Sequence, residues 1–241
     1  MKIEQRHFVA YTEVKPDYTM QLRSLLGLLQ DAAVTHSEQA GFGSRKLLDA
    51  GKAWILNKMA VNIERMPAYQ ETIRVETWHR GSRSFRAYRD FLVFSGPERI
   101  AAATSLWLYF DLSAKRLQRI PQQVGQAYTE EPQGAGCTDL DAWKPAAMNG
   151  AGFEVGFTTR SSDFDPLGHI NHTVYFDMIE TLVERTWGPG AKVRDLGIHF
   201  QKEIRRGATE VKASIEKAEN AGKFRIFNET ETFAAGDLEI G

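Results

Sequence analysis

The sequence predicts an α+β fold in which a long helix followed by an antiparallel sheet occurs twice. Two amphipathic segments with helical spacing, at 21–41 and 171–187, are each followed by several segments rich in aromatic and β-branched residues. A stretch rich in Gly, Pro, Gln and Ala, at 121–156, separates the two series. Because a helix buries its apolar stripe against one face of a sheet, we expect each sheet to wrap its own helix.

The composition is that of a soluble globular protein. The 241 residues are 42% hydrophobic and 25% charged, and 30 basic against 31 acidic side chains give a formal charge of −1. This balance argues against a nucleic-acid-binding protein, which carries a basic excess. No 18-residue apolar run predicts a membrane span, and the first residues lack the apolar core of a signal peptide. With a single cysteine, Cys137, no internal disulfide can form, so we expect a cytoplasmic protein.

In the first half, the segment 21–41 has leucines and alanines at three- and four-residue spacings and ends at Gly41, a suitable C-cap. A shorter helix is expected near 44–50. Four strands are expected after it, separated by turn residues. Their predicted ranges are 54–63, 72–78, 85–94 and 101–110.

The second half repeats this plan. Asn171 is expected to cap a helix that ends before Gly188, and strands are expected at 193–203, 210–219, 223–233 and in the last few residues. An offset of 148 residues places Asp17 opposite Asp165, which suggests a divergent repeat. The predicted organisation is an N-terminal unit at 1–125, a connector at 126–155 and a C-terminal unit at 156–241.

Short motifs follow one another in a fixed order along the first half. They are LQDAA at 29–33, WILNKM at 54–59, VETW at 75–78, RDF at 89–91 and RIP at 119–121. In this the chain resembles the fatty acyl-ACP thioesterases of plants and bacteria. DFDPLGHIN at 163–171 and IHFQKE at 198–203 continue the resemblance. It implies a double hotdog fold, with each long helix cradled by its sheet. It also implies a hydrolase of fatty acid biosynthesis that releases free fatty acid and holo-ACP.

The family's site motif reads aspartate, any residue, asparagine, any residue, histidine, then valine-asparagine-asparagine. Asp165, His169 and Asn171 occupy its aspartate, its histidine and the first of its later asparagines, whereas Leu167 stands at the middle asparagine. Glu203 matches a glutamate on the following strand. The resemblance therefore implies that Asp165, His169 and Glu203 are catalytic.

Ile204 replaces the cysteine that follows this glutamate in the plant members. Ile204 and Leu167 both depart from the family pattern. Such departures favour an alternative in which the protein binds acyl groups with weak catalytic activity.

These residue types suit thioester hydrolysis. Either Asp165 or Glu203 could act as a base on water or attack the carbonyl carbon, and the sequence leaves this choice open. His169 could orient the thioester or protonate the leaving thiolate. Backbone N–H groups at the start of the helix that Asn171 caps would stabilise the oxyanion. Asp163 is expected to be part of the local turn only.

The first half is expected to supply the acyl pocket, because no histidine accompanies Asp17. The predicted lining residues are Leu25, Leu29, Trp54, Leu56 and Met59. The implied partner is an acyl carrier protein, which is acidic, so a basic docking surface is expected. Four arginines are candidates for it: Arg80, Arg83, Arg86 and Arg89.

The carrier of the substrate stays open, because DPLGHIN is also similar to hotdog thioesterases that act on acyl-CoA. Neither an i, i+4 histidine pair nor a CxxC pair indicates a metal site, and no phosphate-binding glycine loop is present. We expect no cofactor. Chain-length preference and pairing into a homodimer are also left open.

Overall fold

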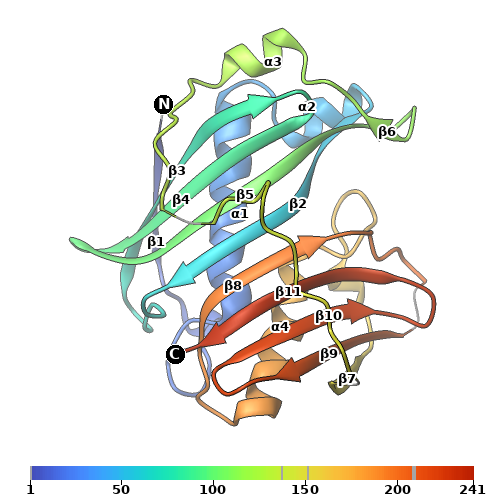
Figure 1. Ribbon diagram of the computed structural model, residues 1–241. Helices are drawn as coiled ribbons and strands as arrows, with labels where there is room; N and C mark the ends of the chain where they lie inside the picture. Colours follow the sequence, from blue (N-terminus) through green and yellow to red (C-terminus); the bar gives the residue numbers. More distant parts are fainter. Residues whose placement is uncertain (1, 137, 151, 208–209) are drawn as a thin grey trace.

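The computed structural model describes the chain except residues 1, 137, 151 and 208–209, so the expectations about Cys137 lie outside the described residues. Within them, one antiparallel sheet of eleven strands curves around two long helices, α1 (Leu22–Gln39) and α4 (His172–Trp187) (Figure 1). No helix in the described part of the chain is long and apolar enough to cross a bilayer.

The strand order β1-β3-β4-β5-β2-β8-β11-β10-β9-β7 is symmetrical about the junction of β2 with β8. There, Lys58 pairs with His199 and Asn62 with Asp195, which makes one sheet of the two halves. This is the double hotdog that the resemblance implies. The strands of the first half are β1 (Ile3–Phe8), β2 (Lys52–Ile63), β3 (Thr72–Arg83), β4 (Arg86–Ser95), β5 (Glu98–Asp111) and β6 (Arg116–Leu117). Those of the second half are β7 (Phe153–Phe157), β8 (Val193–Phe200), β9 (Val211–Lys217), β10 (Ala221–Phe227) and β11 (Thr232–Ile240).

Three parts of the secondary structure differ from the sequence prediction. The strand expected at 223–233 is two strands, β10 and β11, because Asn228 accepts the N–H groups of Thr230 and Glu231 and closes a turn. The edge strands β1 and β7 were missed, as was the helix α3 (Gln122–Ala127). β7 begins at Phe153 and pairs with β9, so the second unit starts within the range predicted for the connector.

The loops that lead into α1 and α4 have the same hydrogen bonds 150 residues apart. The N–H of Lys15 donates to the carbonyl of Thr19, and the N–H of Asp165 donates to that of His169, both at 2.8 Å. Each loop follows a short 3₁₀ turn, at Tyr11–Glu13 and Ser161–Asp163. The repeat is therefore in register at an offset of 150.

This register corrects the offset of 148. Lys15, not Asp17, is the structural counterpart of Asp165, and Asp17 corresponds to Leu167. Asp17 accepts the N–H of Thr19 at 3.0 Å, so it stabilises the first loop from a different position. The first half thus has no carboxylate at the place of Asp165.

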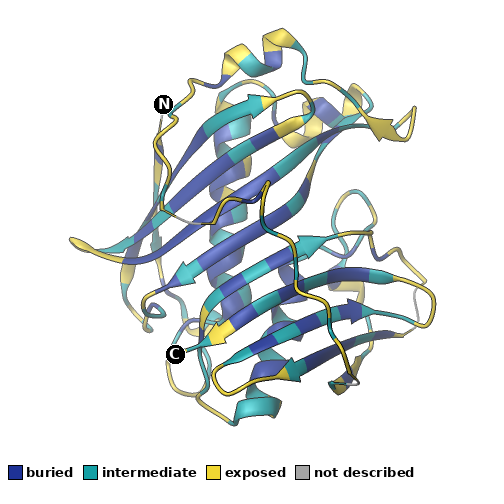
Figure 2. Ribbon diagram, viewed as in Figure 1, coloured by how far each residue is buried: buried dark blue, intermediate teal, exposed yellow. Residues whose placement is uncertain are grey.

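One hydrophobic core runs through both halves. The apolar stripe of α1 and that of α4 face the concave side of the sheet. Figure 2 shows alternation of buried and more exposed residues in β10 and β11, and continuous buried runs in β2 and β5. Burying each large aliphatic side chain contributes roughly 1.5 to 3 kcal/mol. Side chains on one face of a helix recur about every 3.6 residues, and those on one face of a strand every 2 residues, which is why apolar spacing in the sequence distinguishes the two.

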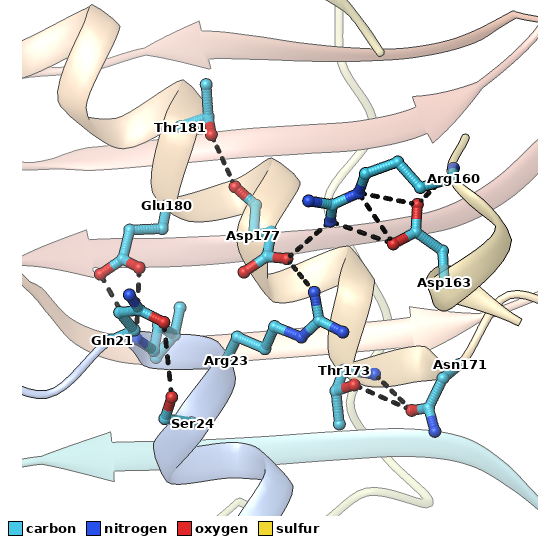
Figure 3. Close-up of polar contacts among 11 residues, drawn as sticks. Gln21, Arg23, Ser24, Arg160, Asp163, Asn171, Thr173, Asp177, Glu180 and Thr181 are labelled. Carbon is cyan, nitrogen blue, oxygen red and sulfur yellow. Dashed lines mark hydrogen bonds and ion pairs between the residues drawn. The ribbon is translucent and has the colours of Figure 1, made fainter. Parts of the chain in front are cut away.

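Polar contacts also join the two long helices (Figure 3). Glu180 of α4 accepts the N–H of Leu22, the first residue of α1, at 3.2 Å, and its carboxylate lies 3.0 Å from the Nζ of Lys15. Arg23 donates to Asp177 at 2.6 Å. The N-terminus of α1 is therefore capped by the other half of the molecule.

The connector crosses the outer face of the sheet from the first half to the second (Figure 1). Lys58 of β2 is buried beneath it and donates to the carbonyl groups of Leu140 and Trp143 at 2.8 and 2.7 Å. Further on, the N–H of Ala146 donates to Asp237 of β11 at 3.2 Å. The connector is therefore attached to strands of both halves.

The ion pair of Glu71 with Arg65 predicts a loss of stability in acid. Arg65 donates to both carboxylate oxygens, at 2.7 and 3.1 Å, and lowers the pKa of Glu71 from 4.5 to about 2. Because the folded pKa is depressed, this stabilisation is complete above about pH 5 and is lost as the pH falls towards 2. We expect Glu71→Gln to lower the free energy of unfolding by about 1 to 2 kcal/mol at pH 7. The difference from the unmodified protein should shrink as the pH approaches 2 in urea denaturation. A constant difference would contradict the assignment.

Candidate active site

Asp165 organises the loop that precedes α4. Its Oδ1 atom accepts the N–H of Leu167 at 2.9 Å and that of His169 at 3.2 Å, while Gly168 adopts a φ of 77° that completes the turn. The carboxylate is half-buried. Its second oxygen, Oδ2, has no hydrogen-bond partner in the described part of the chain. One oxygen is thus structural and the other is available for chemistry.

The segment after β8 lies against this loop. The N–H of Ile170 donates to the carbonyl of Ile204 at 2.9 Å, and His169 forms a β-bridge with Arg205. This brings Glu203 so close to His169 that the histidine contributes to the low pKa of the glutamate. The structure therefore brings together Asp165, His169 and Glu203.

Glu203 is exposed and paired with Arg205. Its Oε1 atom accepts Nη2 of Arg205 at 2.5 Å and Nε at 3.1 Å, and these hydrogen bonds lower the pKa of the carboxyl below its ordinary value. Since the depressed pKa lies below 4.5, Glu203 is ionised at neutral pH.

Tyr175 of α4 is a member of this group that the sequence did not reveal. The residue is only 3% exposed, and burial raises the pKa of its hydroxyl, an effect that a backbone hydrogen bond at Ile204 opposes. Glu203 and Asp165 raise the pKa further, so the phenol lies near both carboxylates. A signal was present in the sequence, since a buried tyrosine in an apolar stripe requires a polar partner.

We expect Tyr175→Phe to lower kcat about 2- to 10-fold, because one hydrogen bond near the two carboxylates is lost. The thermal midpoint should change by only a few degrees, since the ring remains in the core. Steady-state kinetics on an acyl thioester, beside a melting curve, would check both. An unchanged kcat would show that the hydroxyl of Tyr175 takes no part in the reaction.

The N-terminus of α4 holds the candidate oxyanion donor. Asn171 accepts the N–H and the hydroxyl of Thr173 on its Oδ1 atom, each at 3.0 Å (Figure 3). Its carbonyl accepts the N–H of Val174 at 2.9 Å. The N–H of His172 has no acceptor among the described residues. Asn171 therefore caps the helix, and a backbone N–H at its start is free to bind negative charge.

The first half differs at the equivalent place. There the matching N–H, that of Leu22, is occupied by Glu180. The counterpart of Glu180 at the repeat offset is Gln30, an uncharged side chain whose Oε1 atom is buried without a partner in the described structure. The start of α1 is blocked by a carboxylate while that of α4 is not, so only the second of the two helix starts offers this N–H to a ligand.

The ring of His172 contacts aromatic side chains beside the site. Its ring packs edge-on against Trp107 and Phe200, with centroids 6.2 and 5.8 Å away. Burial lowers its pKa to about 4, so the ring is neutral at neutral pH. His172 therefore contributes packing and a backbone donor rather than charge.

A cavity of about 120 Å³ extends from this loop into the first half. Leu167 lines it beside the loop, and the remaining lining comes from α1, α2 (Ser44–Asp49), β2, β4 and β5, together with Phe42 and Tyr128 in loops. Most of the lining is apolar, with Trp54 and Trp107 as the largest side chains. The leucine that replaces the family's middle asparagine thus forms part of an apolar wall.

The predicted pocket residues need a correction. Trp54 lines the cavity, whereas Leu25, Leu29 and Met59 belong to the central core, and Leu56 is buried without lining the cavity. The reason is the direction of α1. Its leucines face the concave sheet, and Ala33, Val34 and Ser37, further along the helix, face the cavity.

The four arginines do not form one docking surface. Arg89 is buried, and Arg86 pairs with Asp141 of the connector at 3.1 Å. Arg80 lies over the ring of Tyr88 and 3.7 Å from Asp90. A patch of all four arginines is therefore wrong, because alternation along β4 places Arg89 on the face opposite to Arg86, where it is buried.

No group of three or more His, Cys, Asp or Glu side chains among the described residues is arranged to hold a metal ion.

Comparison with known proteins identifies the family of the chain. A family model described as acyl-ACP thioesterase N-terminal domain matches residues 1–128, and one described as acyl-ACP thioesterase C-terminal domain matches residues 147–236. The dodecanoyl-[acyl-carrier-protein] hydrolase of Cinnamomum camphora is 27% identical over 206 residues, which cover 79% of this chain and 53% of that protein. The palmitoyl-acyl carrier protein thioesterase of Gossypium hirsutum is 25% identical over 230 residues, covering 88% of this chain and 56% of the relative. The chain thus spans about half the length of these curated relatives.

Solved structures show the same fold. An acyl-ACP thioesterase from Bacteroides thetaiotaomicron aligns with a TM-score of 0.87 at 19% identity, over 100% of this chain and 98% of the other. The 12:0-ACP thioesterase from Umbellularia californica aligns with a TM-score of 0.84 at 20% identity, over 100% and 97%. At this identity the match establishes the double hotdog architecture.

Proposed function

The chain belongs to the acyl-ACP thioesterase family, and on that premise we propose that it hydrolyses an acyl thioester carried by acyl carrier protein. The products are the free acid and the free thiol of the carrier. The observation that carries the proposal is the cavity that begins at Leu167, in the loop held by Asp165, and runs into the first half. A carbonyl at this loop would have its acyl chain in the cavity and its reacting atoms beside the carboxylates.

Binding comes first in the mechanism. The carbonyl oxygen of the thioester accepts the N–H of His172, where the dipole of α4 favours the negative charge that develops during attack. The start of α1 offers no such donor, because Glu180 occupies it. The position of the bound thioester is therefore determined by the N-terminus of α4 and by the cavity together.

The chemical step uses a carboxylate. Asp165, through Oδ2, or Glu203 removes a proton from a water that attacks the carbonyl carbon, or attacks that carbon itself to form an anhydride that water then opens. The C–S bond breaks and the thiolate leaves with a proton, for which His169 is positioned. The N–H of Ile170 holds the backbone at Ile204 against this loop.

The acyl carrier as the partner is supported by the family and by the printed activities of the curated relatives. A hotdog thioesterase acting on acyl-CoA is the alternative. A reducing, cytoplasmic location is part of the proposal and is supported by the single cysteine.

One kinetic panel tests this function. The same acyl group is offered on acyl carrier protein and on coenzyme A, over a series of chain lengths, and kcat/KM is measured for each. We expect a clear preference for the protein carrier. Greater efficiency on coenzyme A would replace the proposed carrier, and acyl binding without any hydrolysis would favour an acyl-binding protein.

A further inference from the structure

The acyl cavity is small for a fatty acyl chain. An engineered apolar cavity of about 150 Å³ binds benzene, whereas this cavity has about 120 Å³. By that comparison it holds about five carbon atoms. A dodecanoyl chain is more than twice as long. The residue that closes the cavity therefore determines which acyl chains can enter.

Tyr128 bounds the cavity on the side away from the catalytic loop. Its ring lies 5.3 Å from that of His79 in β3. The loop of Leu167 lies instead against the segment after β8, through the hydrogen bond of Ile170 to Ile204. In the sheet, β4, β5 and β2 lie between β3 and β8, and these three strands carry the strand residues of the lining. A chain that enters beside Leu167 therefore runs towards Tyr128.

The side chain of Tyr128 is held on several sides. It is 6% exposed, and its ring packs edge-on against that of His36 in α1, with centroids 5.5 Å apart. Burial raises the pKa of its hydroxyl, and contacts with the side chains of Ser37 and Trp54 oppose this rise. Ser37 and Trp54 also line the cavity, from α1 and from β2. The phenol thus lies across the cavity between a helix and the sheet.

The backbone that carries Tyr128 is fixed to the sheet on both sides of this residue. Tyr128 directly follows α3. Before it, the N–H of Ile120 donates to the carbonyl of Ser84 at 2.8 Å, and after it, the N–H of Glu131 donates to that of His79 at 2.9 Å. Val124 of α3 is buried as well. The segment between the two halves, and not only the long helices and strands, therefore shapes the acyl cavity.

We propose that Tyr128 sets the longest acyl chain that the protein accepts, and that the preferred chains have about six to eight carbons. The carbonyl carbon and its neighbour stay at the loop of Asp165, and the following carbons fill the cavity as far as the phenol ring. The inference rests on the proposed thioesterase function and specifies its substrate class. Tyr128 is a specificity residue, since it excludes longer chains and does not touch the reacting atoms.

The unmodified protein provides the first test. Hexanoyl, octanoyl, decanoyl and dodecanoyl thioesters of one acyl carrier protein are compared by kcat/KM. We expect hexanoyl or octanoyl to give the highest value and dodecanoyl a value at least about 10-fold lower. Each CH₂ group that loses its place in the cavity costs about fourfold, so two or more account for this difference. A kcat/KM that rises all the way to dodecanoyl would overturn the proposal.

Replacement of Tyr128 tests the residue itself. Tyr128→Ala should raise the dodecanoyl-to-octanoyl ratio of kcat/KM by at least about 10-fold, because two or more further CH₂ groups gain room. Tyr128→Phe keeps the ring and should keep the ratio of the unmodified protein. Tyr109→Ala is the matched control. Tyr109 is also buried, and its ring lies 4.9 Å from that of Trp54, but it does not line the cavity.

Melting curves show whether each variant folds. If Tyr128→Ala does not fold, Tyr128→Leu, which keeps part of the apolar contact, should shift the ratio in the same direction by a smaller factor. An unchanged ratio in a folded Tyr128→Ala or Tyr128→Leu protein would contradict the assignment. An equal shift in Tyr109→Ala would do the same, because it would show that any loss of packing lengthens the accepted chain.

Ligand binding separates this inference from the hydrolytic function. Amide analogues of the octanoyl and dodecanoyl carriers, in which N–H replaces the thioester sulfur, are titrated calorimetrically into the protein. The octanoyl analogue should bind about 10-fold more tightly, and Tyr128→Ala should remove the difference. If this is found while no thioester is hydrolysed, the proposed function fails and the role of Tyr128 stands. If thioesters are hydrolysed and dodecanoyl is favoured throughout, the function stands and the role of Tyr128 fails.

Discussion

Replacing Asp165 by Asn, or Glu203 by Gln, is expected to lower kcat by about 100- to 10,000-fold on an acyl thioester. Each change keeps the size of the side chain but removes the negative charge that activates water or attacks the carbonyl carbon. Asparagine can still accept the N–H groups of Leu167 and His169 through its Oδ1 atom, so the loop should keep its shape. The double variant should lose little more than the worse single one, because the two groups serve one reaction.

The chain offers a matched control. Asp17→Asn removes a carboxylate that accepts a backbone N–H in the corresponding loop of the first half, and it should leave kcat unchanged. If Asp165→Asn is as active as this control, Asp165 is not catalytic. A single turnover in ¹⁸O-labelled water would further distinguish direct attack from base catalysis. Base catalysis puts the label into the released acid, whereas only an anhydride that water opens at the enzyme's carboxyl carbon puts it into the carboxylate of the enzyme.

The pH profile adds a check on Glu203. Activity that requires its ionised form falls as the pH drops through the pKa, and hydrogen bonds from Arg205 hold that pKa below 4.5. The acid limb should therefore lie below pH 4.5 if Glu203 is the base. Arg205→Met should move the limb to higher pH. If the acid side of the pH profile does not shift in Arg205→Met, the base is Asp165.

The second large effect concerns stability. Gly236→Ala is expected to lower the free energy of unfolding by roughly 3 kcal/mol. A Cβ atom at this position in β11 would overlap the carbonyl oxygen of Gly197 in β8 and the ring of Phe224 in β10. Because the obstacle includes backbone of a paired strand, a change of side-chain rotamer cannot relieve it. Chemical denaturation of the purified variant would measure the loss.

Gly156→Ala is the control for the same substitution in a strand. Gly156 lies in the edge strand β7, is exposed, and has nothing within 4 Å of the added atom. Its free energy of unfolding should change by less than about 0.5 kcal/mol. Equal losses in both variants would mean that strand propensity, rather than the close approach of β8 and β11, determines the effect.

The main elements of the fold could be predicted from local patterns. α1 and α4 have long apolar stripes, and β2 to β5 are long and rich in aromatic and β-branched residues, so period and composition agree. The edge strands β1 and β7 were missed because each is half exposed and short, which weakens both signals. The turn at Asn228 was missed because the apolar pattern continues on both sides of it.

The site was harder to predict than the fold. Asp165, His169 and Glu203 were found through a family motif. Tyr175 and the free N–H of His172 were not. The position of Tyr175 in the apolar stripe of α4 indicates that it needs a polar partner but not which one, and an unoccupied backbone donor leaves no mark in a residue pattern. The offset of the repeat was wrong by two residues. The sequence has too few identities between the halves to determine it, whereas the repeated hydrogen bonds of the two loops do so directly.

By itself, the sequence determined the α+β class and the double helix-and-sheet plan, because these depend on periodicity and on short motifs. Its choice of Asp165, His169 and Glu203 as catalytic residues stays a prediction. Only the tertiary structure decided which helix start is open and which is blocked, since Glu180 reaches Leu22 across 158 residues of chain. It also decided that Arg89 and Leu167 line the same cavity while Asp90 faces the connector. These facts depend on contacts between distant segments, where the direction of a side chain is set by packing and not by its neighbours in the chain.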